Sequence, residues 1–251
     1  MANFADKFHV KAEAFSLLFL ISWVTPSWAV EIETNSISMD NAPAWVKSNR
    51  VEKVVEQIQS RLEWDIRKVK VTWYSDQPTF EKLHGFGPAV LAFARQSDNS
   101  IQIGPRVTDA TFDGIFGHEL VHVILYQKYK GSVPKWLEEG LANYTVQRDT
   151  VDYKWLASQP EVDVHTLVHP FKGYSSDDVA VHARYHYAAS KALVELIASK
   201  CDLSELLQLS VGSSKGSHLT KLETYLSTFC GIDDINVEFR KWIKQKSTKN
   251  H

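Results

Sequence analysis

The sequence predicts an α+β fold in which a small, sheet-containing N-terminal lobe precedes a mostly helical C-terminal lobe. Strand-like alternation of apolar and polar residues is confined to the first part of the chain, and from Thr108 onward the apolar spacing is helical nearly to the end. The composition, 44% hydrophobic and 23% charged over 251 residues, is that of a globular chain that can bury a core.

Residues 1–29 are predicted to be a signal peptide that is cleaved near Ala29. Lys7 and Lys11 precede the apolar run "AFSLLFLISWV", and Ser27 and Ala29 occupy the small-residue positions of a cleavage site. The run is shorter than the roughly 20 residues that span a bilayer. We therefore expect export to a periplasmic or extracellular compartment with no stable membrane insertion after cleavage. The alternative is an N-terminal anchor or a buried helix.

Residues 30–42 show no sustained apolar period and are expected to be a leader into the fold. Residues 43–251 are expected to form a single domain, with the sheet lobe in 43–131 and the helical lobe in 132–251. The first element of this domain is an amphipathic helix, in which apolar residues recur at helical spacing, namely Val46, Val51, Val54, Val55, Ile58 and Leu62.

Three strands are predicted after this helix. Val69, Val71 and Trp73 alternate with polar residues, as in a half-buried strand. The segment "AVLAFARQSDNSIQIGP" then indicates two strands joined by a turn at residues 97–99. A small sheet is therefore expected before the helical half of the chain.

The helical half is predicted to open with two consecutive helices. The first covers "ATFDGIFGHELVHVILYQKYKG" and stops at Gly131, and the second covers "VPKWLEEGLANYTVQ" and opens with Pro134. A long helix in "VAVHARYHYAASKALVELIASK" and three further helical segments complete the chain. Cys201 and Cys230, the only cysteines, are expected to form a disulfide in an oxidising compartment, although two separate buried thiols are the alternative.

The formal net charge of −2 gives the whole chain no general attraction to nucleic acid, so no nucleic-acid partner is expected. The C-terminal run "FRKWIKQKSTKN" is basic, but such a run is usually the solvated face of a helix. The composition therefore assigns no function to it.

The motif "HELVH" predicts a metal site. His118 and His122 lie four residues apart, so both imidazoles project from one helix face and can converge on a single ion, whereas Glu119 is turned aside, where its carboxylate can accept a proton. Catalytic zinc usually takes three protein ligands. The next helix offers Glu138 and Glu139, of which Glu139, directly before a glycine, is the predicted ligand. Glu138 is expected to be exposed or to lie behind the ligands.

These residues resemble the gluzincin metallopeptidases and their peptidase MA-like domains, which carry HExxH followed by "WLxEGxAxY". The resemblance implies a zincin-like fold with an edge strand above the motif helix. It also implies Zn²⁺ on His118, His122 and Glu139, with Glu119 as the general base. The predicted strand pair looks like the one that binds an extended substrate at its edge.

The resemblance weakens outside the two zinc motifs. The helix "YHYAASKALVELI" is similar to one in which a tyrosine stabilises the oxyanion, which falls on Tyr187, with Tyr185 ranked second. The exopeptidase element "GxMEN" is absent, which favours an endopeptidase over an aminopeptidase. We expect surface or supporting positions, rather than a second metal site, for four other histidines, namely His165, His169, His182 and His186.

The function expected from these residues is an exported zinc metallopeptidase that hydrolyses peptide bonds in a peptide or protein substrate. In this expectation a zinc-bound water is activated by Glu119. Two alternatives stay open. One is a zinc-binding module of the same kind that binds polypeptide without turnover, and the other is a structural protein with no metal.

Overall fold

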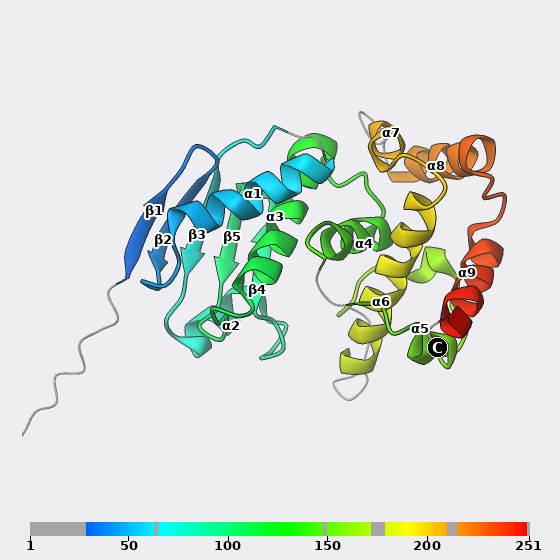
Figure 1. The fold of residues 1–251 in the computed structure, drawn as a ribbon. Helices are drawn as coiled ribbons and strands as arrows, with labels where there is room; N and C mark the ends of the chain where they lie inside the picture. Colours follow the sequence, from blue (N-terminus) through cyan, green and yellow to red (C-terminus); the bar gives the residue numbers. More distant parts are fainter. Residues whose placement is uncertain (1–28, 63–64, 148–149, 172–178, 210–214, 250–251) are drawn as a thin grey trace, which may run out of the picture.

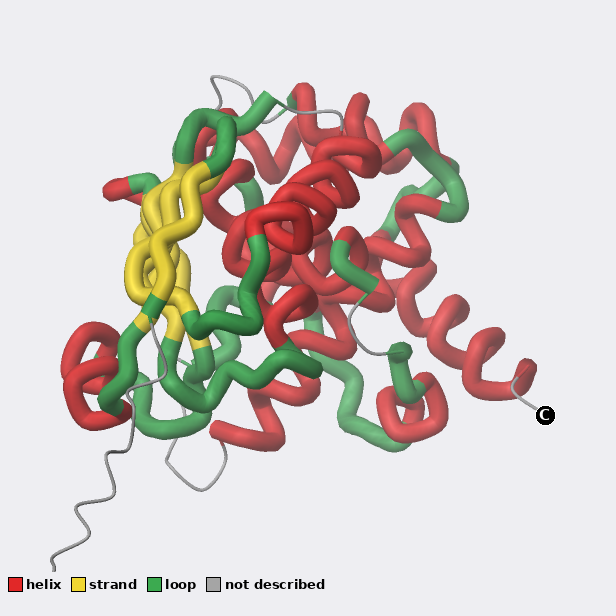
Figure 2. The backbone as a smooth tube through the Cα atoms, turned by 60° about the vertical axis from the view of Figure 1, so that its left-hand side comes forward, coloured by secondary structure: helices red, strands yellow, loops and turns green. Residues whose placement is uncertain are grey.

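The computed structural model describes residues 29–62, 65–147, 150–171, 179–209 and 215–249 (Figure 1). Nearly all of the expected signal peptide, residues 1–28, lies outside the described residues. A sheet with helices packed on it is followed by a helical half, as the α+β prediction requires. Figure 2 shows the sheet with most of the helices lying to one side of it.

The sheet has five strands in the order β1-β2-β3-β5-β4. The three inner strands are parallel to one another, and β1 and β4 pair antiparallel at the two edges. The strands are β1 (Val30–Glu33), β2 (Ile37–Ala42), β3 (Val69–Trp73), β4 (Ala92–Arg95) and β5 (Ser100–Ile103). A short 3₁₀ turn, η1 (Gln96–Asp98), joins β4 to β5, so the predicted strand pair and its turn are confirmed.

The prediction of a leader in residues 30–42 was wrong, because this segment forms β1 and β2. Ile37, Met39 and Ala42 are completely buried. The apolar period was obscured because the segment makes two short strands with a polar turn between them. Asn41 adds a left-handed residue with φ of 61°, which interrupts the alternation near the end of β2.

Two helices pack beside one another at the sheet, α1 (Ser48–Leu62) and α3 (Phe112–Tyr129) (Figure 1). α3 contacts β4 and β5, so the edge strand lies next to the helix that carries His118 and His122. Both helices and the burial of Val69, Val71 and Trp73 were predicted. Two short helices were not, α2 (Gln77–His84) and α5 (Tyr153–Ala157).

The helical half is built on α4 (Lys135–Thr145) and α6 (Val179–Ala198). α4 packs against α3 on one side and α6 on the other, and one buried apolar cluster continues from the sheet through these helices. Smaller helices complete the half, namely α7 (Leu203–Gln208), α8 (Lys215–Cys230) and α9 (Ile235–Lys249). A 3₁₀ turn, η2 (Val164–Thr166), precedes α6.

The expected disulfide between Cys201 and Cys230 is present, with the two Cα atoms 5.3 Å apart. It links the segment after α6 to the end of α8. Disulfides persist in oxidising environments, so this bond favours such a compartment. None of the described helices has both the length and the apolar character that crossing a bilayer requires.

The close approach of α4 to α6 requires a glycine at position 140. A Cβ at this position would lie 2.3 Å from the carbonyl oxygen of Ser190 and 2.6 Å from Cγ2 of Val194. Backbone cannot yield as a flexible side-chain end can, so any larger residue would push the two helices apart. Gly140 therefore sets the position of the helix that carries Glu139.

We expect Gly140→Ala to destabilise the protein by about 1–3 kcal/mol, which is typical of overpacking in a core. Glycine-to-alanine changes inside helices ordinarily stabilise by up to about 1 kcal/mol, so the sign of the effect is diagnostic. Chemical denaturation of the two proteins measures it. An unchanged or increased free energy of unfolding would show that α4 and α6 are not in this close contact.

Candidate metal centre

His118 and His122 lie one turn apart on α3. This helix is buried on most sides, and it ends where Lys130 and Gly131 adopt left-handed conformations with φ of 53° and 75°. The two imidazoles are each about 6% exposed, and their Nε2 atoms are 3.1 Å apart. The helical spacing thus brings two nitrogen donors together in the interior.

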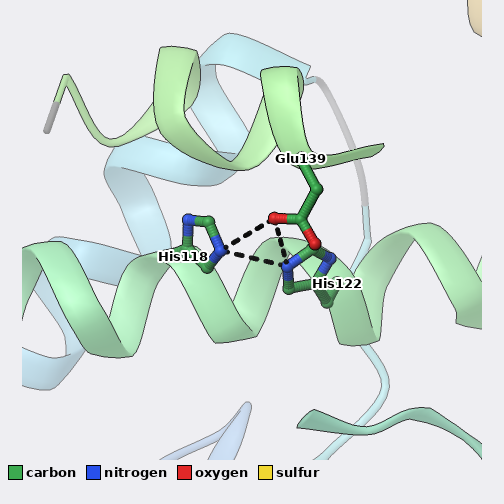
Figure 3. A group of neighbouring side chains, drawn as sticks. All are labelled: His118, His122 and Glu139. Atoms are coloured by element: carbon green, nitrogen blue, oxygen red, sulfur yellow. Dashed lines mark hydrogen bonds and ion pairs between the residues drawn. The ribbon is translucent and has the colours of Figure 1, made fainter. Parts of the chain in front are cut away.

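Glu139 reaches the same point from α4 (Figure 3). Its Oε2 atom lies 3.3 Å from Nε2 of His118 and 3.4 Å from Nε2 of His122. No hydrogen-bond donor in the described part of the chain is directed at this buried oxygen, whose close polar neighbours are the two imidazole nitrogens. The three side chains form a buried group that can bind a metal ion, as the sequence predicted.

Glu138 is not exposed, because it lies behind His122 and is only 8% accessible. Its Oε1 is 2.6 Å from Nδ1 of His122 and accepts a hydrogen bond of 2.6 Å from Nε2 of Gln96. When the imidazole is neutral, a proton on Nδ1 leaves the Nε2 lone pair directed at the donor group. A carboxylate in this position orients a metal-binding histidine and raises its basicity.

Lys135, which the sequence analysis did not single out, completes the cluster. Its Nζ lies 2.9 Å from Oε1 of Glu139 and 3.3 Å from Oε1 of Glu138. Burial lowers the pKa of this lysine, but the charges of the two glutamates outweigh burial and the pKa rises. The sequence did contain a signal for this contact. Lys135 precedes the two glutamates by three and four residues, and this spacing places all three side chains on one side of a helix.

The titration of the cluster follows from burial and from these charge pairs. Burial raises the pKa of Glu138 and of Glu139, but the effect of their cationic neighbours is larger. The pKa of Glu138 therefore falls to about 2, and the pKa of Glu139 falls well below its usual range. Burial lowers the pKa of His122, but Glu139 and Glu138 raise it to about 10. Glu119 is the exception, because burial raises its pKa and the two histidines only reduce the shift.

A pocket of about 200 Å³ opens beside the metal-binding group. Glu119 and His118 line it together with Tyr187, whose ring centroid lies 6.1 Å from that of His118. Leu91 and Ala92, where the edge strand begins, form another wall. The predicted general base therefore faces the same space as the tyrosine ranked first for the oxyanion.

Tyr185 faces a different place. It lines a separate pocket next to α5 and α9, among residues that include Leu156 and Phe239. Although Tyr185 and Tyr187 are only two residues apart on α6, helical geometry sends their side chains in different directions. The structure therefore brings Tyr187, and not Tyr185, to the pocket beside Glu119.

Aromatic rings connect the two halves of the molecule near this pocket. The ring centroid of Phe86, from the segment after α2, lies 5.9 Å from that of His169 and 6.1 Å from that of Phe171. Phe171 lines the pocket, and its ring centroid lies 6.2 Å from that of Tyr187. This connection was not predicted, because contacts between distant loops leave no periodic pattern in a sequence.

The other histidines that the structure describes do not assemble a second centre. Among the described residues, the one group of three or more metal-ligating side chains is that of His118, His122 and Glu139. His165 lies 3.4 Å from a carboxylate oxygen of Glu223. His186 is buried, with Nδ1 3.3 Å from the hydroxyl of Ser190, so it is not a surface residue.

We expect zinc binding to the metal-free protein at pH 7.5 to release at least one proton. His122 with a pKa of about 10 holds a proton at this pH, and a metal can use Nε2 only after that proton has left. Apparent affinity should therefore rise with pH between about 6.5 and 9. Calorimetric titration in HEPES and in Tris measures the release, and a binding enthalpy that is the same in both buffers would contradict it.

Comparison of the chain with protein-family models, with curated protein sequences and with solved structures found no match in any of the three. The resemblance of "HELVH" and "WLEEG" to the gluzincins therefore stays a prediction.

Proposed function

We propose that the protein is a zinc-dependent peptidase of the gluzincin type, with a zincin-like fold, and that it acts as an endopeptidase. The observation that supports this most strongly is the buried triangle of donor atoms formed by His118, His122 and Glu139, with sides of 3.1, 3.3 and 3.4 Å. Glu119 and a pocket large enough for a small group lie directly beside it.

The dimensions of the triangle suit zinc. Tetrahedral coordination with bonds of about 2.0–2.1 Å places neighbouring donor atoms roughly 3.3–3.4 Å apart, close to the three distances observed. Structural zinc sites are closed by four protein ligands, whereas catalytic sites take three and leave one position open. Two histidines and one glutamate are a known donor set of zinc hydrolases. The number and kind of donors therefore favour a catalytic site.

The chemistry that zinc supplies in such a site is Lewis acidity, which lowers the pKa of water and polarises a carbonyl group. The residues of this chain can perform the remaining tasks. Glu119 lines the pocket and has a raised pKa, which suits a group that accepts a proton and returns it to a leaving amine. Tyr187 lines the same pocket and can donate a hydrogen bond to an oxyanion.

Substrate docking is proposed along the edge strand β4. This strand pairs on one side only, with β5, and it packs against α3. An extended peptide can add to such an edge through main-chain hydrogen bonds, which tolerate many sequences. Leu91 and Ala92 belong to both the edge and the pocket, so a peptide bound there would pass Glu119. This arrangement, together with the lack of a "GxMEN" element, favours cleavage within a chain.

We expect Glu119→Gln to retain about one zinc per chain and to lower kcat/KM for peptide cleavage by roughly 10²–10⁴-fold. The amide keeps the shape of the side chain but cannot accept a proton, which is the usual magnitude for loss of a general base. Cleavage of a mixed peptide library, with zinc content measured on the same samples, tests this. Glu52→Gln, at an exposed position on α1, is the matched control and should leave both quantities unchanged.

Three results would redirect the proposal. A Glu119→Gln protein with substantial peptidase activity would remove Glu119 from the role of base. A wild-type protein that holds zinc and cleaves no peptide in the library would favour the binding module without turnover. Wild-type protein without zinc, and with thermal stability unaffected by chelator, would favour a structural protein.

A further inference from the structure

Lys135 occupies a position that local helix energetics do not favour. It is the first residue of α4, where the partial positive charge of the helix N-terminus repels a cation. Lysine placed before glutamate at a spacing of four is also the weaker orientation of such a pair. Its side chain is nevertheless only 26% exposed and is directed at two buried carboxylates. The reason for a lysine here therefore lies in the cluster and not in the helix.

The two carboxylates that Lys135 contacts have different jobs in the centre. Glu139 offers Oε2 to the donor triangle and Oε1 to the lysine, so one carboxylate is shared between the metal-binding group and the ammonium. Glu138 shares Oε1 between the lysine and Nδ1 of His122. Lys135 thus contacts both Glu139, the third proposed ligand, and Glu138, which orients His122. It is not itself a metal ligand.

We propose that Lys135 is a positioning residue that acts as the built-in counter-cation of the metal centre and competes with the metal for the negative charge of Glu139. This inference rests on the proposed function, because it requires that the three donors bind zinc. It goes beyond that function because it assigns a control of metal affinity to a residue that is neither ligand nor base.

The direction of the effect follows from the net charge of Lys135, Glu138 and Glu139. With the histidines neutral, as metal binding requires, these three residues carry one net negative charge, which a divalent ion changes to one net positive charge. With a neutral residue at position 135 the same group would carry two negative charges, and the ion would make it neutral. Buried net charge is unfavourable, so the lysine stabilises the metal-free centre and weakens metal binding.

An opposing effect is the loss of orientation when the lysine is removed. The lysine holds one oxygen of Glu139 in place. Without the lysine, the Glu139 side chain regains rotamer freedom, which it would lose again on binding the metal. Restricting one side chain is a smaller effect than placing a unit charge near a divalent ion in a buried site, where screening by water is weak. Electrostatic competition should therefore dominate.

Zinc titration of three variants tests this proposal. Lys135→Met keeps most of the volume and removes the charge, Lys135→Arg keeps the charge, and Lys154→Met removes an exposed lysine on α5. With a chromophoric chelator as competitor at pH 7.5, we expect Lys135→Met to bind zinc at least about tenfold more tightly than wild type. Lys135→Arg should stay within about threefold, and Lys154→Met should match wild type.

Thermal unfolding with and without zinc supplies the second readout. Metal-free Lys135→Met should melt at a lower temperature than metal-free wild type, and zinc should raise its Tm by more than it raises that of wild type. A Lys135→Met protein that folds only when zinc is present supports the proposal, because the metal then replaces the missing cation.

Zinc affinity of Lys135→Met that is equal to or weaker than that of wild type would overturn the proposal, as would a variant that does not fold even with zinc. Either result, with zinc bound normally by wild type, leaves the proposed peptidase intact and removes only the role of Lys135. Wild-type protein that binds no zinc would refute both.

Discussion

The approach of α4 to α3 is the contact on which the rest of the site depends. α3 alone presents two imidazoles on one face, and α4 alone presents a lysine and two glutamates within its first five residues. Only when the helices pack do Glu139 and the histidines form one group, and Glu138 then reaches Nδ1 of His122. This packing is fixed from behind by Gly140, where the backbone of α6 leaves no room for a side chain.

Burying so many ionisable groups together is unfavourable unless each has a partner. In this cluster most of the partners are other members of the cluster. Glu138 is bonded to His122 and Gln96, and Lys135 bridges both glutamates. Oε2 of Glu139, the oxygen directed at the imidazoles, lacks a hydrogen-bond donor among the described residues. A divalent cation at that point would be a partner for this oxygen, so the cluster can bind a metal ion.

Local patterns in the sequence predicted much of this arrangement. The features that were not predicted were missed for physical reasons. The spacing of His118 and His122 predicts a shared helix face whatever the fold, and the residue before Gly140 was predicted to be the third ligand. The strands in residues 30–42 were missed because a polar turn separates them and because Asn41, in a left-handed conformation, interrupts the alternation of β2. The burial of Glu138 and the role proposed for Lys135 depend on how α4 docks against α3 and on the contact of Glu138 with Gln96 of η1, which is tertiary information. The contact of Phe86 with His169 and Phe171 is of the same kind.

Anomalous diffraction at the zinc edge, from crystals of the wild-type protein grown with one equivalent of zinc, would locate the ion. We expect a single strong peak within bonding distance of Nε2 of His118, Nε2 of His122 and Oε2 of Glu139, with no fourth protein ligand. A peak at another place in the molecule, or none near these three atoms, would show that this group does not bind the metal.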